Sequence, residues 1–343
     1  MRPILVRALR REIVERTPVW YMRQAGRCLA EYRALRERFG ILEIVRTPEL
    51  CARVTAMPVS RLGVDAAVLY ADIMLPLDGM GVPFRIEPEL GPIVEAPVRD
   101  ARAVDALRVI PAEAATPYLF ETIRALRRTL PPEIALIGFC GAPFTLASYL
   151  IEGRPSRDYA LTKAMLLGEP ALWSRFMNTL VDVLGRYLRA QIDAGVDAIQ
   201  IFDSWAGALG TEDYARAVLP YTRQLFAQIG ARVPRIHFTS GNPALLPLVA
   251  SVECEAVSVD WRVPLDEAWR AIGARAIQGN LEPAVCLAPW DVVAARADDV
   301  LRRANGRPGH VFNLGHGVLA VTDADILARL AAHVRDARIT IAA

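Results

Sequence analysis

Residues 134–151 read IALIGFCGAPFTLASYLI and form the longest stretch of the chain without a charged residue. The run approaches the length of a membrane span, but Gly138, Gly141 and Pro143 interrupt it. Its first half is a continuous apolar run, as is typical of a fully buried parallel strand. The stretch therefore predicts a buried strand, a turn and the start of a helix.

The same unit recurs along the chain. Eight apolar or β-branched runs end in turn or polar residues, and they cover residues 17–22, 65–71, 133–140, 197–202, 235–238, 256–260, 275–279 and 310–314. Helical stretches lie between them, for example residues 117–130, 169–195, 211–230, 265–273 and 322–337. Repeated strand–helix alternation predicts an α/β fold with a single (β/α)8 TIM-type barrel.

One insertion interrupts this alternation. Residues 78–100 contain prolines, glycines and short strand-like pieces, which predicts a hairpin laid over the top of the second strand. The chain shows no linker, low-complexity segment or change of composition. We therefore expect residues 1–343 to form one domain.

Charge and cysteine content limit the classes of function. Lysine and arginine number 40 against 38 acidic residues, so the net charge of +2 predicts binding to neither nucleic acid nor a membrane surface. The five cysteines are odd in number and form no C-x-x-C pair, which indicates a reducing, cytoplasmic setting. The arginine-rich N-terminus contains Glu12 and Glu15, which argue against a transit peptide.

Positive charge is concentrated between Pro18 and Gly40. This segment holds five arginines, at positions 23, 27, 33, 36 and 38, opposed only by Glu31 and Glu37. Arg23 and Arg27 are four residues apart, which predicts that they share one face of a helical turn. Because the planar guanidinium group can bind both oxygens of a carboxylate, the cluster predicts a ligand with several acidic groups.

Polar residues follow the predicted strands, at the end of a barrel where active sites lie. Asp72 lies in the apolar sequence VLYADIML, and a buried carboxylate is costly unless it is paired. It either forms an ion pair with a barrel arginine or is kept for a cationic or N–H-rich ligand. Tyr149, Ser204 and His316 also follow strands, although capping or core hydrogen bonds explain many such residues.

Six motifs resemble the uroporphyrinogen decarboxylase family: PVWYMRQAGRCLAEYR, LYADIML, GAPFTLASYLIEG, FDSWAG, IQGNLEP and FNLGHGV, spread from about residue 17 to about residue 318. The resemblance implies a cytosolic homodimer of (β/α)8 barrels without a metal or organic cofactor. It also implies a lyase of haem biosynthesis that converts the four acetate side chains of uroporphyrinogen III to methyl groups, giving coproporphyrinogen III and carbon dioxide.

The resemblance also assigns residues to roles. It implies that Asp72 bonds the pyrrole N–H groups and that arginines bind the carboxylates of the substrate. The implied substrate-binding residues are Arg23, Gln24, Ala25, Gly26, Arg27, Arg36, Asp72, Tyr149, Ser204 and His316. The implied catalytic residues are Asp72, Arg23, Tyr149 and His316. The proton donor stays open between Arg23, Tyr149, His316 and a bound water.

The chain departs from the family pattern at a few positions. Cys28 and Ala30 replace residues of the usual GRYLPEYR, and Arg154 and Arg157 stand where lysines are common. The first two changes lie beside the arginines and not on them. They therefore affect local packing more than the chemistry of the site.

Two other functions fit parts of the pattern. A zinc-dependent methyltransferase on the same barrel, acting on corrinoid-bound or thiol methyl groups, needs an H-x-C motif. In this chain His237 is followed by Phe238 and then by Thr239, which stands where the motif has cysteine. Cys254 and Cys286 have no partner at ligand spacing. The second alternative, a non-catalytic protein that binds a tetrapyrrole or polyanion, needs only the arginines.

Overall fold

The structure is a computed structural model that describes residues 2–87 and 90–337. Within these residues, seven strands form one parallel sheet in the order β1-β4-β5-β6-β7-β8-β9. They are β1 (Ala66–Val68), β4 (Ala135–Gly141), β5 (Ala198–Asp203), β6 (Arg235–Thr239), β7 (Ala256–Ser258), β8 (Ala276–Gln278) and β9 (His310–Val311). The prediction of an α/β fold with a parallel sheet is confirmed.

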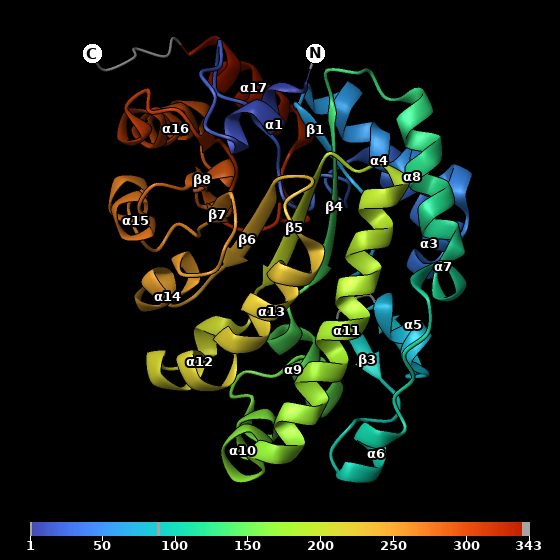
Figure 1. Cartoon of the computed structure of the whole chain (residues 1–343). Helices are drawn as coiled ribbons and strands as arrows, with labels where there is room; N and C mark the ends of the chain where they lie inside the picture. Colours follow the sequence, from blue (N-terminus) through green and yellow to red (C-terminus); the bar gives the residue numbers. More distant parts are fainter. Residues whose placement is uncertain (1, 88–89, 338–343) are drawn as a thin grey trace.

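Helices surround the strands, and α1 and α17, the first and last helices of the described residues, lie at the edge of the molecule opposite α10 (Figure 1). The helices before β4 are α1 (Ile4–Leu9), α2 (Ala30–Arg36), α3 (Ile41–Arg46), α4 (Pro48–Leu62), α5 (Pro76–Met80), α6 (Ala101–Asp105), α7 (Ala112–Ala115) and α8 (Pro117–Thr129). Those after β4 are α9 (Pro143–Glu152), α10 (Ala160–Gly168), α11 (Pro170–Ala194), α12 (Thr211–Ala217), α13 (Leu219–Ile229), α14 (Leu246–Ala250), α15 (Leu265–Ile272), α16 (Trp290–Ala304) and α17 (Ala324–Asp336). Short 3₁₀ turns cover Ala206–Ala208, Pro243–Leu245 and Pro283–Leu287.

The first predicted strand, residues 17–22, is not a strand of the sheet. Val19 forms a single parallel bridge to Phe312, and its carbonyl oxygen accepts a hydrogen bond from the Asp65 N–H at 2.8 Å. The chain turns immediately afterwards, because Arg23 has a φ of 60° in the left-handed region. The segment therefore bonds to residues beside both edge strands of the sheet without extending far enough to count as a strand.

Two further strands lie between β1 and β4. β2 (Phe84–Glu87) pairs antiparallel with β3 (Gly91–Val94), in the segment for which the sequence predicts an inserted hairpin. Residues 88 and 89, between the two strands, lie outside the described residues. The pair is separate from the parallel sheet.

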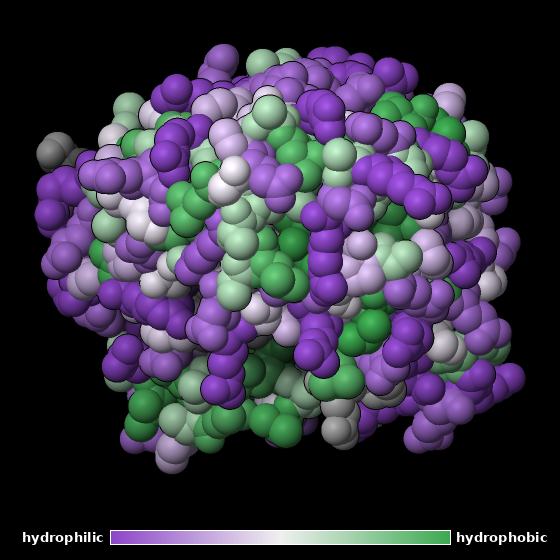
Figure 2. Space-filling model, turned by 90° about the horizontal axis from the view of Figure 1, so that it is seen from below, coloured by the Kyte–Doolittle hydropathy of each residue, from purple (hydrophilic) through white to green (hydrophobic). Residues whose placement is uncertain are grey.

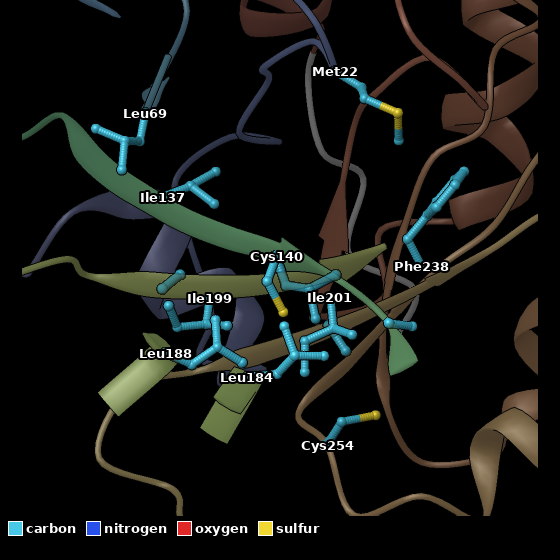
Figure 3. Packing of buried hydrophobic residues seen from close by; sticks show 14 of the residues in the cluster. Met22, Leu69, Ile137, Cys140, Leu184, Leu188, Ile199, Ile201, Phe238 and Cys254 are labelled. Carbon is cyan, nitrogen blue, oxygen red and sulfur yellow. The ribbon is translucent and has the colours of Figure 1, made fainter. Parts of the chain in front are cut away.

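The two faces of the strands carry different residues. On β5, Ile199 and Ile201 point toward Leu184 and Leu188 of α11 (Figure 3). Gln200, the residue between them, bonds instead across the interior, since its Oε1 accepts from Gln278 Nε2 at 3.0 Å. This alternation, which a strand imposes, sends Phe202 to the inner face and Asp203 to the helix-facing side.

Candidate active site

A cavity of about 550 Å³ opens beside the carboxyl ends of the first strands. Figure 2 views the molecule from this end, where hydrophobic residues lie among hydrophilic ones. Five chain segments and seven single residues form the wall. The segments are residues 22–28, 68–73, 86–87, 91–92 and 316–320, and the single residues include Phe139, Tyr149 and Ser204. Trp20, Tyr32, Ile41 and Phe202 complete it.

The segment that carries Arg23 and Arg27 forms two consecutive turns in the cavity wall and not the predicted helical turn. The Gln24 N–H donates to the Tyr21 carbonyl at 3.1 Å, and the Leu29 N–H donates to the Gly26 carbonyl at 3.0 Å. A Cβ at position 26 would lie 2.9 Å from the Arg23 carbonyl oxygen, so this close turn needs glycine. Arg23 and Arg27 nevertheless both line the cavity.

Gln24 holds this turn in place. Its Oε1 accepts from the Tyr21 N–H at 3.0 Å, and its Nε2 donates to the Ala66 carbonyl on β1 at 2.8 Å. The side chain is fully buried, so its polar atoms are committed to the protein backbone. The turn that carries Arg23 is therefore fixed to the first strand of the sheet.

Asp72 follows β1 in a turn at the cavity wall. Its Oδ1 accepts a hydrogen bond from the Met74 N–H at 2.9 Å. Burial raises the pKa of Asp72, and the Met74 N–H and the nearby charge of Arg23 oppose that rise. Asp72 is therefore held by a backbone donor, with Arg23 acting on it through its charge.

Tyr149 reaches the cavity from α9. Its ring lies 3.9 Å from the Trp205 ring, centroid to centroid, at an interplanar angle of 32°. Burial and the charge of Asp72 raise the pKa of Tyr149, while Arg23 lowers it. The phenol therefore keeps its proton at neutral pH, close to both charged groups.

His316 follows β9, near the other end of the chain from β1, and it lines the cavity. Burial lowers the pKa of His316 to about 4, and the charges of Arg23 and Arg262 act in the same direction. Its ring meets the edge of Phe238 at 5.8 Å between centroids. The imidazole is therefore neutral at neutral pH, with one nitrogen able to donate and the other to accept.

Nine of the ten predicted substrate-binding residues line this cavity: Arg23, Gln24, Ala25, Gly26, Arg27, Asp72, Tyr149, Ser204 and His316. Arg36 lies outside the lining formed by the described residues, and its guanidinium donates to the Phe39 carbonyl. The field of Arg36 still acts to lower the pKa of Tyr70.

Sequence reasoning missed two features of the wall. The hydroxyls of Tyr32 and Tyr70 lie 2.7 Å apart, and burial raises the pKa of Tyr70 far above its usual range. Tyr70 stands two residues before Asp72, a proximity that marks it as a candidate. Phe139 and Phe202 meet edge to face at 5.5 Å between centroids and give the cavity an apolar side.

The residues of the zinc alternative do not assemble. His237 packs against Phe226 of α13, with 5.3 Å between ring centroids, and so faces the helices. Cys254 lies in the packed core (Figure 3), and Cys286 is buried in the 3₁₀ turn Pro283–Leu287. Across residues 2–87 and 90–337, no group of three histidine, cysteine or acidic side chains has the arrangement of a metal site.

The described helices include none that is both long and apolar enough to cross a membrane. This agrees with the glycine and proline interruptions in residues 134–151, which the structure forms as β4 and α9.

Comparison with known proteins gives a consistent result. The family model described as "Uroporphyrinogen decarboxylase (URO-D)" matches residues 2–337. A uroporphyrinogen decarboxylase of Thermobifida fusca is 51% identical over 331 residues, covering 96% of this chain and 91% of that protein. The Thermus thermophilus protein of the same name is 49% identical over 320 residues, covering 93% of both chains.

Among solved structures, a methyltransferase from Methanosarcina mazei superposes with a TM-score of 0.82 at 20% identity, covering 96% of both chains. At 20% identity, the similarity shows only that the two proteins share a fold. The family match and the close relatives instead span nearly the whole sequence. The chain belongs to the uroporphyrinogen decarboxylase family.

Proposed function

We propose that this protein removes the carboxyl groups from the four acetate side chains of uroporphyrinogen III. The products are coproporphyrinogen III and four molecules of carbon dioxide, on the route to haem. The observation that carries this proposal is the meeting of Arg23, Arg27 and Asp72 around one cavity. The substrate combines acidic arms with a ring of pyrrole N–H groups, and the cavity combines arginines with a carboxylate.

Asp72 acts on the ring in this proposal. Loss of carbon dioxide leaves an electron pair on the side-chain carbon, and a pyrrole protonated at the adjacent ring carbon accepts it. A carboxylate beneath the N–H groups stabilises that cationic ring. Two opposite charges at ~4 Å and an effective dielectric constant of ~20 attract by about 4 kcal/mol. Enzymes lower barriers by ~8–23 kcal/mol, so positioning supplies much of the remainder.

In this proposal the arginines and the aromatic residues of the cavity contact different arms of the substrate. Arg23 and Arg27 anchor acidic arms that keep their charge. The reacting arm belongs on the apolar side beside Phe139 and Phe202, because tight binding of the departing carboxylate would hinder its loss. Dry surroundings also favour the neutral carbon dioxide over the carboxylate.

Tyr149, Ser204 and His316 complete the contacts to substrate as hydrogen-bonding groups. Each step replaces a carboxyl group by a proton, so one proton enters the site for each arm. Burial raises the pKa of Tyr149, so its phenol gives up a proton as poorly as Arg23 does, and His316 is already neutral. We therefore propose that water in the cavity mouth delivers the proton.

We also propose the finer architecture implied by the family. Residues 1–343 form one (β/α)8 barrel domain in which residues 17–22 serve as the eighth strand, and the bonds of Val19 to both sides support this. β2 and β3 form the inserted hairpin, whose Ile86 and Pro92 contribute to the cavity wall. The protein acts in the cytoplasm as a homodimer without a metal or organic cofactor, as the resemblance implies.

The direct test is incubation of the purified chain with uroporphyrinogen III without oxygen. After oxidation, the porphyrins are separated by their number of carboxyl groups. We expect intermediates with seven, six and five carboxyl groups and a final product with four. Recovery of the eight-carboxyl compound alone, bound to the protein, would instead support a non-catalytic binding protein. Metal analysis that finds stoichiometric zinc in the purified chain would support the methyltransferase alternative.

A further inference from the structure

Thr145 makes two hydrogen bonds that span a residue of the cavity wall. Its hydroxyl donates to Asp203 Oδ1 at 3.1 Å and accepts from the Trp205 N–H at 3.4 Å. Ser204, which lines the cavity, lies between these two partners in the sequence. The chain at Ser204 is therefore tied to α9 on both sides.

The same contacts reach Tyr149. Thr145 and Tyr149 are one helical turn apart on α9, so they lie on the same face of the helix. The Trp205 ring lies against Tyr149 at 3.9 Å and also contacts Tyr159 at 5.0 Å between centroids. Thr145 holds the backbone of Trp205, and Trp205 in turn covers the ring of Tyr149.

Asp203 lies behind the cavity and not in it. It is fully buried and faces the layer between the sheet and the helices. Its Oδ2 lies 4.0 Å from His237 Nε2 on β6. Burial raises the pKa of Tyr214 of α12, and the charge of Asp203 adds to that rise. The described residues of the cavity wall do not include Asp203. It therefore acts on the site only through Thr145 and the chain that follows it.

We propose that Asp203 and Thr145 are a positioning pair that sets Ser204 and the Trp205–Tyr149 stack for the reacting arm. This rests on the proposed function, in which Tyr149 and Ser204 contact the substrate. An active-site misplacement of about 1 Å can lower a rate ~100-fold, so loss of the tie is expected to act on turnover more than on binding. If the pair had a purely structural role, its loss would change the stability of the protein but would not change kcat and KM to different extents.

The test compares Thr145→Val, which removes the hydroxyl with little change of shape, with Thr145→Ser, which keeps it. The wild-type chain is first assayed with uroporphyrinogen III. If it is active, we expect Thr145→Val to lower kcat at least about tenfold with KM within about threefold. Thr145→Ser should stay within about threefold of the wild type in both parameters. Thr122→Val is the matched control, because Thr122 is equally buried, its hydroxyl donates to the Tyr118 carbonyl one turn earlier on α8, and it does not line the cavity.

A second readout does not depend on activity. Trp205 fluorescence is obtained as the difference between each variant and the same variant carrying Trp205→Phe. We expect Thr145→Val to shift the emission maximum of Trp205 and Thr145→Ser to leave it in place. An active wild type whose Thr145→Val variant keeps both kcat and the emission maximum overturns the positioning pair. An inactive wild type that still shows the fluorescence shift overturns the proposed function and leaves the pair standing.

Discussion

Gly317 lies directly against the side chain of Arg23. A Cβ at position 317 would stand 2.5 Å from Arg23 Cδ and 2.9 Å from its Cγ, closer than unbonded atoms approach. The two residues come from opposite ends of the chain, and both line the cavity. Because the three atoms nearest to the added group all belong to the Arg23 side chain, that side chain must give way.

We therefore predict that Gly317→Ala displaces the Arg23 guanidinium and weakens substrate binding. The expected fall in kcat/KM is about tenfold, or about 1.4 kcal/mol, carried mainly by KM. Steady-state kinetics with uroporphyrinogen III measure it. Gly168→Ala is the control, since a Cβ at position 168 meets nothing within 4 Å. An unchanged KM in Gly317→Ala would mean that the position of Arg23 does not govern binding.

Asp72→Asn tests the electrostatic role of the carboxylate. Asparagine keeps an oxygen for the Met74 N–H, so we expect the fold to persist and the melting temperature to change little. Loss of the negative charge removes about 4 kcal/mol of attraction to a cationic ring, which corresponds to a fall in kcat of roughly 1000-fold. Single-turnover rates measure this fall. Asp78→Asn, which changes an acid bonded to Arg46, is expected to keep near-normal turnover. A near-normal rate in Asp72→Asn would remove Asp72 from the central role.

The sequence predicts the strands of the sheet well where each strand is buried on both faces. Residues 133–140 become β4 (Ala135–Gly141), because a continuous apolar run fits only a strand covered on both sides. Residues 17–22 look similar but form only a bridge at Val19, because the N–H groups of Tyr21 and Met22 donate to side chains and not to a neighbouring strand. The composition of the run does not indicate these side-chain bonds.

The site is predictable only where a residue has its own chemical signal. Arg23 and Asp72 stand out as charges in apolar surroundings, and both line the cavity. Thr145 and Asp203 are bonded across 58 positions of sequence, so neither residue type nor local spacing indicates their pairing. The same holds for Tyr32 and Tyr70, whose hydroxyls meet only once the sheet has formed.

Arg27→Ala tests the carboxylate-binding role of the second arginine. We expect KM to rise about tenfold with little change in kcat, because an arm that stays charged loses a charge-assisted bond worth roughly 1.5–3 kcal/mol. Arg27→Lys should recover part of the affinity by keeping the charge without the planar fork. The control is Arg38→Ala, since Arg38 lies over the ring of Phe39 away from the cavity wall. Unchanged kcat and KM in Arg27→Ala would contradict an anion-binding cavity.

The pH dependence of stability tests the burial of Asp203. Burial raises the pKa of Asp203 from its ordinary 3.8 to about 7 in the folded protein. The folded state therefore binds this proton more tightly than the unfolded state. The resulting stabilisation is complete below about pH 4 and is lost as the pH rises through about 7. Each unit of pKa difference corresponds to about 1.4 kcal/mol, so the loss between pH 5 and pH 8 is about 3 kcal/mol.

Asp203→Asn removes this dependence, because an amide does not titrate. The neighbouring His237 has the opposite effect, since burial lowers its pKa to about 3 and stability rises with pH up to about 6.5. That contribution is present in both proteins and cancels in their difference. Urea unfolding at pH 5, 6, 7 and 8 should show the variant gaining about 3 kcal/mol relative to the wild type. Asp182→Asn, at an exposed acid paired with Arg186, should give a constant difference. A constant difference for Asp203→Asn as well would show that the carboxyl group is ionised throughout this range.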